Sequence, residues 1–274
     1  MTVIAMTREM GTLGKDVAQG VADALGLKVI HSELVEHNVA GKMGLQESAV
    51  HRFLEGGASM LERWRINKNV LAQCTAEEIL EHAQQGNVVI RGWGAVSVLR
   101  EIPHVLRVRV CAPMSFREQV MMKRLGQIEP NVAISEIEKN DAAHSDLMRR
   151  LFKADWEDPK HYHVVLNTGH VPIETCVKTI RLFADDPAFQ ETEPARARLA
   201  DKLIAERVHS ALSRIFNNMD AISVGVTGGM VVLSGTVSHN CRPDDIEKMC
   251  RGISGVKAIE NKIEESGGVL IDGI

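Results

Sequence analysis

The fold of this chain is decided by V-I-A-M-T-R-E-M-G-T-L-G-K at residues 3–15. A short apolar strand over 3–6 enters a glycine-bearing turn. Residues 16–25 then have their apolar side chains at helical spacing, and Gly26 is placed to end that helix. The free N–H groups and the dipole at a helix start attract an anion, and Lys15 adds a mobile positive charge. The stretch therefore predicts a site for the phosphates of a nucleotide.

This stretch matches the phosphate-loop pattern G-x-x-x-x-G-K-[ST] only in part. The pattern asks for glycine where Glu9 stands and for a hydroxyl where Asp16 stands. A plain strand, turn and helix without a ligand is the alternative interpretation of G-x-x-G-K. The strand starts at residue 3, and nucleotide-binding α/β domains commonly open in this way, so we favour the phosphate site.

Composition and charge narrow the class of protein. Of the 274 residues, 45% are hydrophobic and 25% are charged, as in ordinary globular proteins, and the net charge of -4 gives no sign of nucleic-acid binding. No apolar run approaches the ~20 residues that would span a bilayer, and no signal peptide precedes the first strand. The five cysteines lie far apart, which favours buried reduced thiols. We therefore expect a soluble, cytoplasmic protein without a transmembrane segment.

The first 185 residues alternate short apolar runs with longer helical patterns, which predicts an α/β domain with a parallel sheet wrapped by helices. A long helical stretch covers roughly 33–85, with a capping box at Thr75-Ala76-Glu77-Glu78. A second helical region, rich in basic residues, runs from 113 to about 156, and a last helix covers 173–183. The predicted strands are Val3–Met6, Leu27–Ile30, Asn87–Arg91, Val105–Cys111 and His163–Leu166.

An acidic stretch bracketed by prolines, residues 187–196, has the composition of a linker. We expect it to separate a first domain, 1–186, from a smaller α+β module, 197–266. The strands of the module show no polar cluster that suggests catalysis, which favours a docking, oligomerising or regulatory role. Its predicted elements are a helix over 197–216, strands over 222–226 and 231–237 around a Gly228-Gly229 hairpin turn, a helix over 244–253 and a strand over 256–263.

Six motifs of the first domain resemble the cytidylate-kinase-like family, a branch of the P-loop nucleoside monophosphate kinases. They are T-R-E-M-G-T-L-G-K at 7–15, V-V-I-R-G-W-G-A at 88–95, L-R-V-R-V-C-A-P at 106–113, K-N-D at 139–141, W-E-D-P at 156–159 and L-N-T at 166–168. The module resembles a BON domain in I-S-V-G-V-T-G-G-M-V-V-L-S-G-T-V at 222–237 and G-V-K-A-I-E-N-K-I at 255–263. The resemblance implies a three-layer P-loop kinase fold with a helical lid.

The resemblance also implies ATP as the phosphoryl donor, together with Mg²⁺. Lys15 would bridge the β- and γ-phosphates, or it is a solvated lysine in the first turn. Asp16 either faces Mg²⁺ or only adds a favourable charge to the helix start, so the metal ligands stay open, with Thr12 a further hydroxyl near the site. The cofactor-binding residues that we expect are Met10, Gly11, Thr12, Leu13, Gly14, Lys15 and Asp16.

Kinases of this fold close a basic lid over the donor and stabilise the moving phosphoryl group with arginines. Arg117, four residues after Pro113, has the best-matching position, and we expect it to act with Lys15 as a catalytic residue. Other basic residues of the lid either contact phosphate or form a solvated helix face. These are Lys123, Arg124, Lys139, Arg149 and Arg150.

For the acceptor, the resemblance implies binding by the glycine turn after the third strand and by the aspartate of the lid. Asp141 would accept hydrogen bonds from a base, a sugar or a lid arginine, or it is a surface acid. Arg52, Arg63 and Arg65 are further candidates to clamp a phosphate bidentately. The substrate-binding residues that we expect are His31, Arg91, Gly92, Gly94 and Asp141.

Three residues depart from the family where the acceptor should bind, namely His31, Trp93 and His144. The two histidines could titrate near neutrality, although a lone histidine is more often structural. The departures indicate either an acceptor other than CMP or a weakened catalyst that still binds nucleotide. We expect an ATP-dependent kinase for a nucleoside monophosphate, CMP or dCMP first, or a related small phosphorylated acceptor. The alternative is a nucleotide-binding regulator that acts through the BON-like module, with a protein partner or by self-association.

Overall fold

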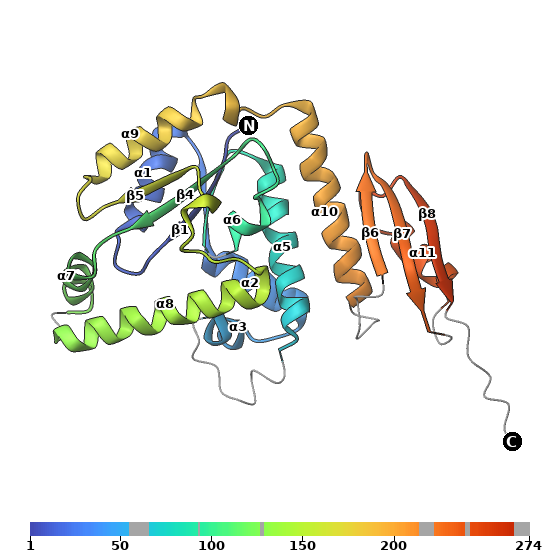
Figure 1. Cartoon of the computed structure of the whole chain (residues 1–274), viewed down its shortest axis with the longest axis horizontal. Helices are drawn as coiled ribbons and strands as arrows, with labels where there is room; N and C mark the ends of the chain where they lie inside the picture. Colours follow the sequence, from blue (N-terminus) through green and yellow to red (C-terminus); the bar gives the residue numbers. More distant parts are fainter. Residues whose placement is uncertain (55–65, 93, 127–128, 214–221, 239–241, 266–274) are drawn as a thin grey trace, which may run out of the picture. The chain divides into compact units, whose positions relative to one another are not determined.

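The computed structural model describes residues 1–54, 66–92, 94–126, 129–213, 222–238 and 242–265 (Figure 1). The chain divides into two compact units, Met1–Ala195 and Arg196–Ile274. Among the described helices, none is long and apolar enough to cross a lipid bilayer. The four cysteines within the described ranges are free thiols, and three of them are buried: Cys74, Cys176 and Cys250.

The first unit is built on a parallel five-stranded sheet with the strand order β2-β3-β1-β4-β5. Its central strand, β1, pairs with β3 on one side and with β4 on the other, so that Val3 lies opposite both Val88 and Val105. All five strands were predicted from their apolar runs, and the parallel α/β fold is confirmed. The strands are β1 (Val3–Arg8), β2 (Lys28–His31), β3 (Val88–Arg91), β4 (Val105–Cys111) and β5 (Val164–Asn167).

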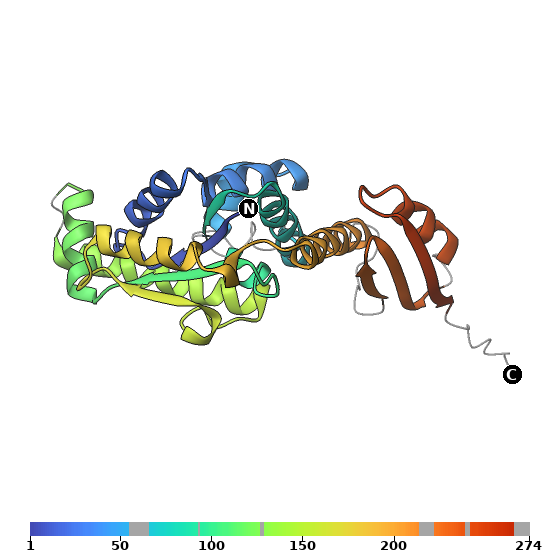
Figure 2. The ribbon, with the colours of Figure 1, turned by 90° about the horizontal axis from the view of Figure 1, so that it is seen from above.

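Helices cover both faces of this sheet and give three layers. On one face, α1 (Gly14–Leu25) lies against α9 (Ile173–Ala184), as Figures 1 and 2 show. On the other face, α6 (Ala95–Val98) contacts β1, and α5 (Lys68–Gln85) contacts β3. The remaining helices of the unit are α2 (Ser32–Met43), α3 (Glu47–Leu54), α7 (Met114–Arg124) and α8 (Pro130–Phe152).

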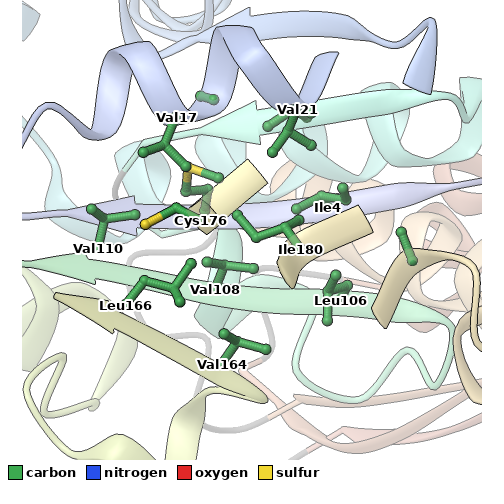
Figure 3. Close-up of a cluster of buried hydrophobic side chains, with 14 of the residues drawn as sticks. Ile4, Val17, Val21, Leu106, Val108, Val110, Val164, Leu166, Cys176 and Ile180 are labelled. Carbon is green, nitrogen blue, oxygen red and sulfur yellow. The ribbon is translucent and has the colours of Figure 1, made fainter. Parts of the chain in front are cut away.

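The core beneath α1 and α9 holds the start of α1 against the sheet (Figure 3). Val17 and Val21 of α1 lie one turn apart and are fully buried with Ile4 of β1 and Ile180 of α9. Each such aliphatic side chain contributes about 1.5–3 kcal/mol when it leaves water. This packing fixes the helix whose first turn follows the loop after β1.

Helix α5 differs from the prediction in its start. The capping box expected at Thr75 is wrong, because Thr75 lies inside α5 and its hydroxyl donates to the carbonyl of Leu71 at 2.7 Å. The helix begins after Asn67, whose side chain accepts hydrogen bonds from the amides of Asn69 and Val70. Glu78, the acid of the expected box, instead contacts Asn38 and Lys42 of α2.

The segment expected as a linker, 187–196, contains two helical pieces. A short 3₁₀ turn covers Pro187–Phe189, and α10 (Glu193–Ser213) begins four residues later. Phe189 packs on the core beneath α9, and the carboxylate of Glu191 lies 3.2 Å from the terminal amine of Met1. The first part of the segment therefore packs on the first unit, and the division between the units falls after Ala195.

The second unit is the predicted α+β module. Strand β7 (Met230–Val237) pairs antiparallel with β6 (Ile222–Thr227) and parallel with β8 (Ala258–Glu265). Its core joins Ile204 and Val208 of α10 to Leu233 of β7 and to α11 (Pro243–Arg251). At the hairpin turn, the carboxylate of Asp201 accepts the amides of Gly228 and Gly229 at 2.8 and 2.9 Å.

Candidate functional site

The loop between β1 and α1 turns through two left-handed residues. Gly11 has φ +79°, and Leu13, the residue before the first turn of α1, has φ 55°. A Cβ at position 11 would lie 2.8 Å from the carbonyl oxygen of Arg117, so that only glycine fits both the dihedral angle and the space. The loop therefore passes directly against the backbone of α7.

This loop leaves a run of amides without partners. Within the described ranges, the backbone N–H groups of residues 10–15 donate no hydrogen bond to the protein. On either side the pairing resumes, because Glu9 donates to the carbonyl of Val110 at 3.1 Å and Asp16 donates to that of Leu13 at 2.9 Å. Lys15 is exposed beside them in the first turn of α1. Consecutive free amides at a helix start, with a lysine, form a binding site for an anion.

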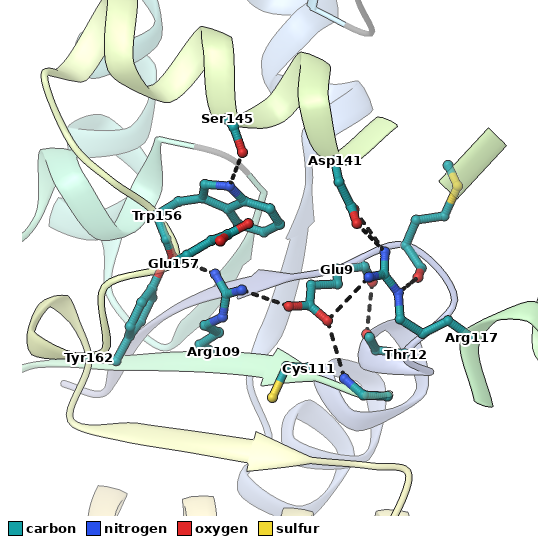
Figure 4. Close-up of polar contacts among 12 residues, drawn as sticks. Glu9, Thr12, Arg109, Cys111, Arg117, Asp141, Ser145, Trp156, Glu157 and Tyr162 are labelled. Carbon is teal, nitrogen blue, oxygen red and sulfur yellow. Dashed lines mark hydrogen bonds and ion pairs between the residues drawn. The ribbon is translucent and has the colours of Figure 1, made fainter. Parts of the chain in front are cut away.

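Glu9 occupies the position where the phosphate-loop pattern has glycine, and its side chain is mostly buried, with 14% exposed. Figure 4 shows its carboxylate between two arginines from different elements. It lies 2.6 Å from Arg109 of β4 and 3.5 Å from Arg117 of α7, and it accepts the amide of Ala112 at 3.2 Å. Sequence reasoning treated Glu9 only as a mismatch, because its partners are about a hundred residues away.

Arg109 ties the end of β4 to the segment after α8. Its guanidinium lies 4.4 Å from the ring centroid of Trp156 and donates to the carbonyl of Trp156. The indole N–H of Trp156 in turn donates to the hydroxyl of Ser145 on α8 at 2.7 Å (Figure 4). These contacts hold α8 next to the β4 end of the sheet.

Arg117 lies behind the loop, with 6% of its side chain exposed. Its Nε donates to the carbonyl of Met10 at 2.7 Å, and its Nη2 donates to both carboxylate oxygens of Asp141 at 2.8 and 2.7 Å. The structure therefore brings together Arg117, which we expected at the phosphoryl donor, and Asp141, which we expected at the acceptor. The guanidinium is engaged by the loop and by α8.

A cleft of about 520 Å³, open to solvent, lies at the carboxyl ends of β1 and β3. A much smaller, mostly apolar pocket lies next to it, and the two share Ser32, Arg91 and Gly92. Helix α8 forms one wall of the cleft through Asn140 and His144. The lining residues of the cleft are Thr7, Arg8, Met10, Ser32, Arg91, Gly92, Asn140 and His144.

Arg91 gives the cleft wall a buried positive charge. The residue is 4% exposed, and burial lowers the pKa of its guanidinium. Its Nη2 lies 3.1 Å from Nδ1 of His31 and 3.6 Å from the carboxylate of Glu33. Within the described part of the chain, its Nε has no hydrogen-bond partner. A buried cation with spare donors fits an anionic group in the cleft.

The two histidines of the site are less basic than we expected. Burial, Arg109 and Arg8 lower the pKa of His144 to about 3, so the expected titration near neutrality is wrong for this residue. Its ring stacks on Trp156 with the centroids 4.1 Å apart. Burial and Arg91 also lower the pKa of His31.

The remaining described residues that we expected at the site lie outside the lining of the cleft. Gly94 precedes α6, where an added Cβ would lie 2.8 Å from the ring of Phe152, so it allows α6 to pack against α8. The hydroxyl of Thr12 is turned inward and donates to the carbonyl of Glu9 at 2.8 Å, whereas Asp16 is exposed. Apart from Arg117, the basic lid residues named above on α7 and α8 are exposed, and Lys139 and Arg150 pair with nearby acids. Trp93, Arg63 and Arg65 lie outside the described residues.

Two parts of the chain match models of known protein families. Residues 3–170 match the model of the cytidylate kinase-like family. The chain belongs to this family. Residues 200–267 match the model of the BON domain, so the second unit carries one. The region matched to the cytidylate kinase-like family holds the loop after β1, Arg117, Asp141 and the whole cleft.

This chain is only distantly similar to individual members of the family. It is 23% identical over 181 residues to a cytidylate kinase from Pyrobaculum calidifontis, which covers 65% of this chain and 90% of that one. It is 23% identical over 178 residues, with the same coverage, to a cytidylate kinase from Pyrobaculum aerophilum. A crystal structure of an uncharacterized protein from Eubacterium ventriosum superposes with a TM-score of 0.54 at 19% identity, covering 68% of this chain and 99% of the other, and shows the same fold.

Proposed function

We propose that this protein transfers a phosphoryl group from ATP to a nucleoside monophosphate, with CMP or dCMP as the first candidate, or to a related small phosphorylated acceptor. The observation that carries the proposal is the run of free amides at residues 10–15 beside the exposed Lys15. Backbone donors at this spacing suit the oxygens of a polyphosphate. Membership of the cytidylate kinase-like family supports ATP as the donor.

Each part of the loop has its own role in holding the donor. The amides from Met10 to Gly14 would surround the β- and γ-phosphates, and Lys15 would bridge them. Within the described ranges, no three side chains form a cluster able to hold a metal ion. Mg²⁺ in kinases is bound largely by the phosphates and one or two carboxylates, and Asp16 is the exposed carboxylate of this turn. When bound, Mg²⁺ neutralises charge on the phosphates.

The cleft suits the acceptor. Arg91 lines the cleft with its positive charge, next to His31 and Gly92, and this charge would attract an anionic group of the acceptor. The nucleophile is a phosphate oxygen of the acceptor that is already ionised, so the transfer needs positioning and positive charge more than a general base. Lys15 and the loop amides at one end, with Arg91 at the other, supply that charge.

A coupled assay of ADP release tests this proposal. Purified full-length protein is given ATP, Mg²⁺ and each nucleoside monophosphate in turn, and the variant Lys15→Ala is compared with Lys178→Ala. Lys178 is an exposed lysine of α9, so its variant should keep the wild-type rate. We expect turnover with one pyrimidine monophosphate, lost in Lys15→Ala. Turnover that survives Lys15→Ala, or silence across the panel, would refute the proposed activity.

One observation favours a second candidate function, a nucleotide-binding regulator with little or no turnover. The hydroxyl that usually follows the loop lysine is replaced by Asp16, and the hydroxyl of Thr12 is bonded inside the loop. Such a regulator would act through the BON domain, on a protein partner or by self-association. It predicts ATP binding that is lost in Lys15→Ala, no ADP release with any acceptor, and a molar mass in light scattering that changes when ATP is added.

A further inference from the structure

A chain of charged residues, with two buried arginines and two partly buried acids, connects the phosphate loop to α8, the helix that forms one wall of the cleft. The carboxylate of Asp141 on α8 lies 2.7 Å from Nη2 of Arg117 on α7. Nε of Arg117 in turn donates to the carbonyl of Met10 in the loop at 2.7 Å. Glu9, at the start of the loop, lies between Arg117 and Arg109. Figure 4 shows the four side chains converging from the loop, β4, α7 and α8.

Arg117 is the contact between the loop and α7, while the other end of the loop is held by the hydroxyl of Thr168, which donates to the carbonyl of Thr12 at 2.6 Å. Arg117 contacts the loop twice, through its side chain on Met10 and through its backbone carbonyl, which leaves no space for a side chain at Gly11. The direction of the free amides beside Met10 and Gly11 therefore depends on where Arg117 lies. Arg117 in turn depends on Asp141, because the carboxylate takes both of its hydrogen bonds from Nη2.

Helix α8 links this chain of charges to the cleft. Asn140 is the residue next to Asp141, and His144 lies one turn further along, and both line the cleft. A movement of α8 that closes on a molecule in the cleft would therefore move Asp141 with it. The charges themselves balance, because Glu9 and Asp141 oppose Arg109 and Arg117 in a mostly buried setting. Removing one carboxylate leaves a buried guanidinium without its counter-charge.

We propose that Glu9, Arg117 and Asp141 are positioning residues that couple α8 to the phosphate loop, so that the position of α8 sets the affinity of the loop for a triphosphate. The inference rests on the proposed role of the loop as the donor site. Coupling of this kind is reciprocal. A molecule that closes α8 raises the affinity for ATP by a certain factor, and ATP raises the affinity for that molecule by the same factor. Neither Glu9 nor Asp141 touches the donor in this scheme.

Calorimetric titration of the full-length protein with ATP, in the absence of any acceptor, tests the coupling. Asp141→Asn keeps the shape of the side chain and removes its charge, and we expect it to weaken ATP binding about tenfold, equal to about 1.4 kcal/mol. The matched control is Asp146→Asn on the same helix, because Asp146 is exposed and pairs with the exposed Arg150. We expect the control to bind ATP as the wild type does.

Two further variants keep the test decisive. Glu9→Gln changes the other end of the chain of charges and should also weaken ATP binding about tenfold. If the chain acts as one unit, the double variant loses less than the product of the two single effects. Should Asp141→Asn fail to fold, Arg117→Lys takes its place, because a lysine cannot hold Met10 and both oxygens of Asp141 at once.

The outcomes separate this inference from the proposed function. ATP affinity that is unchanged or higher in Asp141→Asn, or in Arg117→Lys, overturns the coupling and leaves the kinase proposal intact. An effect only on the KM of the acceptor also overturns it, because it would mark Asp141 as a direct acceptor ligand. If the wild type binds no ATP, the donor site itself is refuted, and the coupling falls with it.

Discussion

Acid should destabilise the first unit through His144, and the variant His144→Phe should remove that part of the effect. The histidine ring stacks on Trp156, and its pKa in the folded protein is about 3, against an ordinary value of 6.5. A histidine whose pKa is lowered by folding contributes stability fully above 6.5. That stability is lost as the pH falls from 6.5 toward 3, because the unfolded chain takes up the proton first.

The size of the effect follows from these two pKa values. Each pH unit below 6.5 removes about 1.4 kcal/mol until the folded form also titrates, so that at about pH 5 the loss is about 2 kcal/mol. Phenylalanine keeps an aromatic ring against Trp156 and has no group that titrates. The other histidines whose pKa is lowered, such as the buried His104 and the exposed His163, are present in both proteins and cancel in the comparison.

Urea unfolding at about pH 7.5 and about pH 5 measures the difference, with tryptophan emission as the signal. All three tryptophans lie in the first unit, so the BON domain does not contribute to it. We expect the free energy of unfolding of the wild type to fall by about 2 kcal/mol more than that of His144→Phe between the two pH values. Equal losses in the two proteins would refute the assignment of a buried, neutral His144.

Three further variants test the local structure around the site. Gly11→Ala should cost the first unit about 2 kcal/mol and weaken ATP binding, because the methyl group meets Arg117 in a left-handed conformation; urea titration and calorimetry measure the two effects. Asn67→Ala should cost about 1 kcal/mol as a lost helix cap, and Asn67→Asp should recover it in the same titration. Glu9→Gly restores the pattern of the loop yet should cost about 3 kcal/mol or more, because Arg109 loses its counter-charge; an unchanged melting temperature would contradict this.

Most of the fold could be predicted because its signals are local. Strand β4 has the sequence V-L-R-V-R-V-C, in which apolar residues flank two arginines and most side chains are buried, and its predicted bounds, Val105–Cys111, are those of the structure. The start of α5 could not be predicted in this way. The sequence T-A-E-E has the pattern of a cap, but Glu78 is drawn away by Asn38 and Lys42, which lie about forty residues earlier. Long-range pairing of a buried acid overrode a local preference.

At the candidate site too, the parts that depend on local sequence could be predicted, and the parts that depend on long-range contacts could not. The loop and Lys15 follow from one strand, one turn and one helix that are contiguous in sequence, and the structure forms them as expected. The surroundings of Arg117 and His144 depend on how α7 and α8 lie over the sheet, which no local pattern encodes. Arg117 was expected at the donor because its position matches the resemblance to the family. The structure places it between Met10 of the loop and Asp141 of α8, and its role at the donor stays a prediction.

Glu9 shows why a mismatch to a pattern need not be a loss of the site. Glycine is favoured where the backbone turns left-handed, and in this loop the left-handed residues are Gly11 and Leu13, whereas Glu9 has a negative φ. The backbone therefore makes no demand for glycine at position 9. Its side chain lies between two arginines, and one of these, Arg117, fixes the carbonyl of Met10. The conformation of the loop thus depends on a charge network as well as on its glycines. A substitution at Glu9 should therefore change the contact between Arg117 and α8.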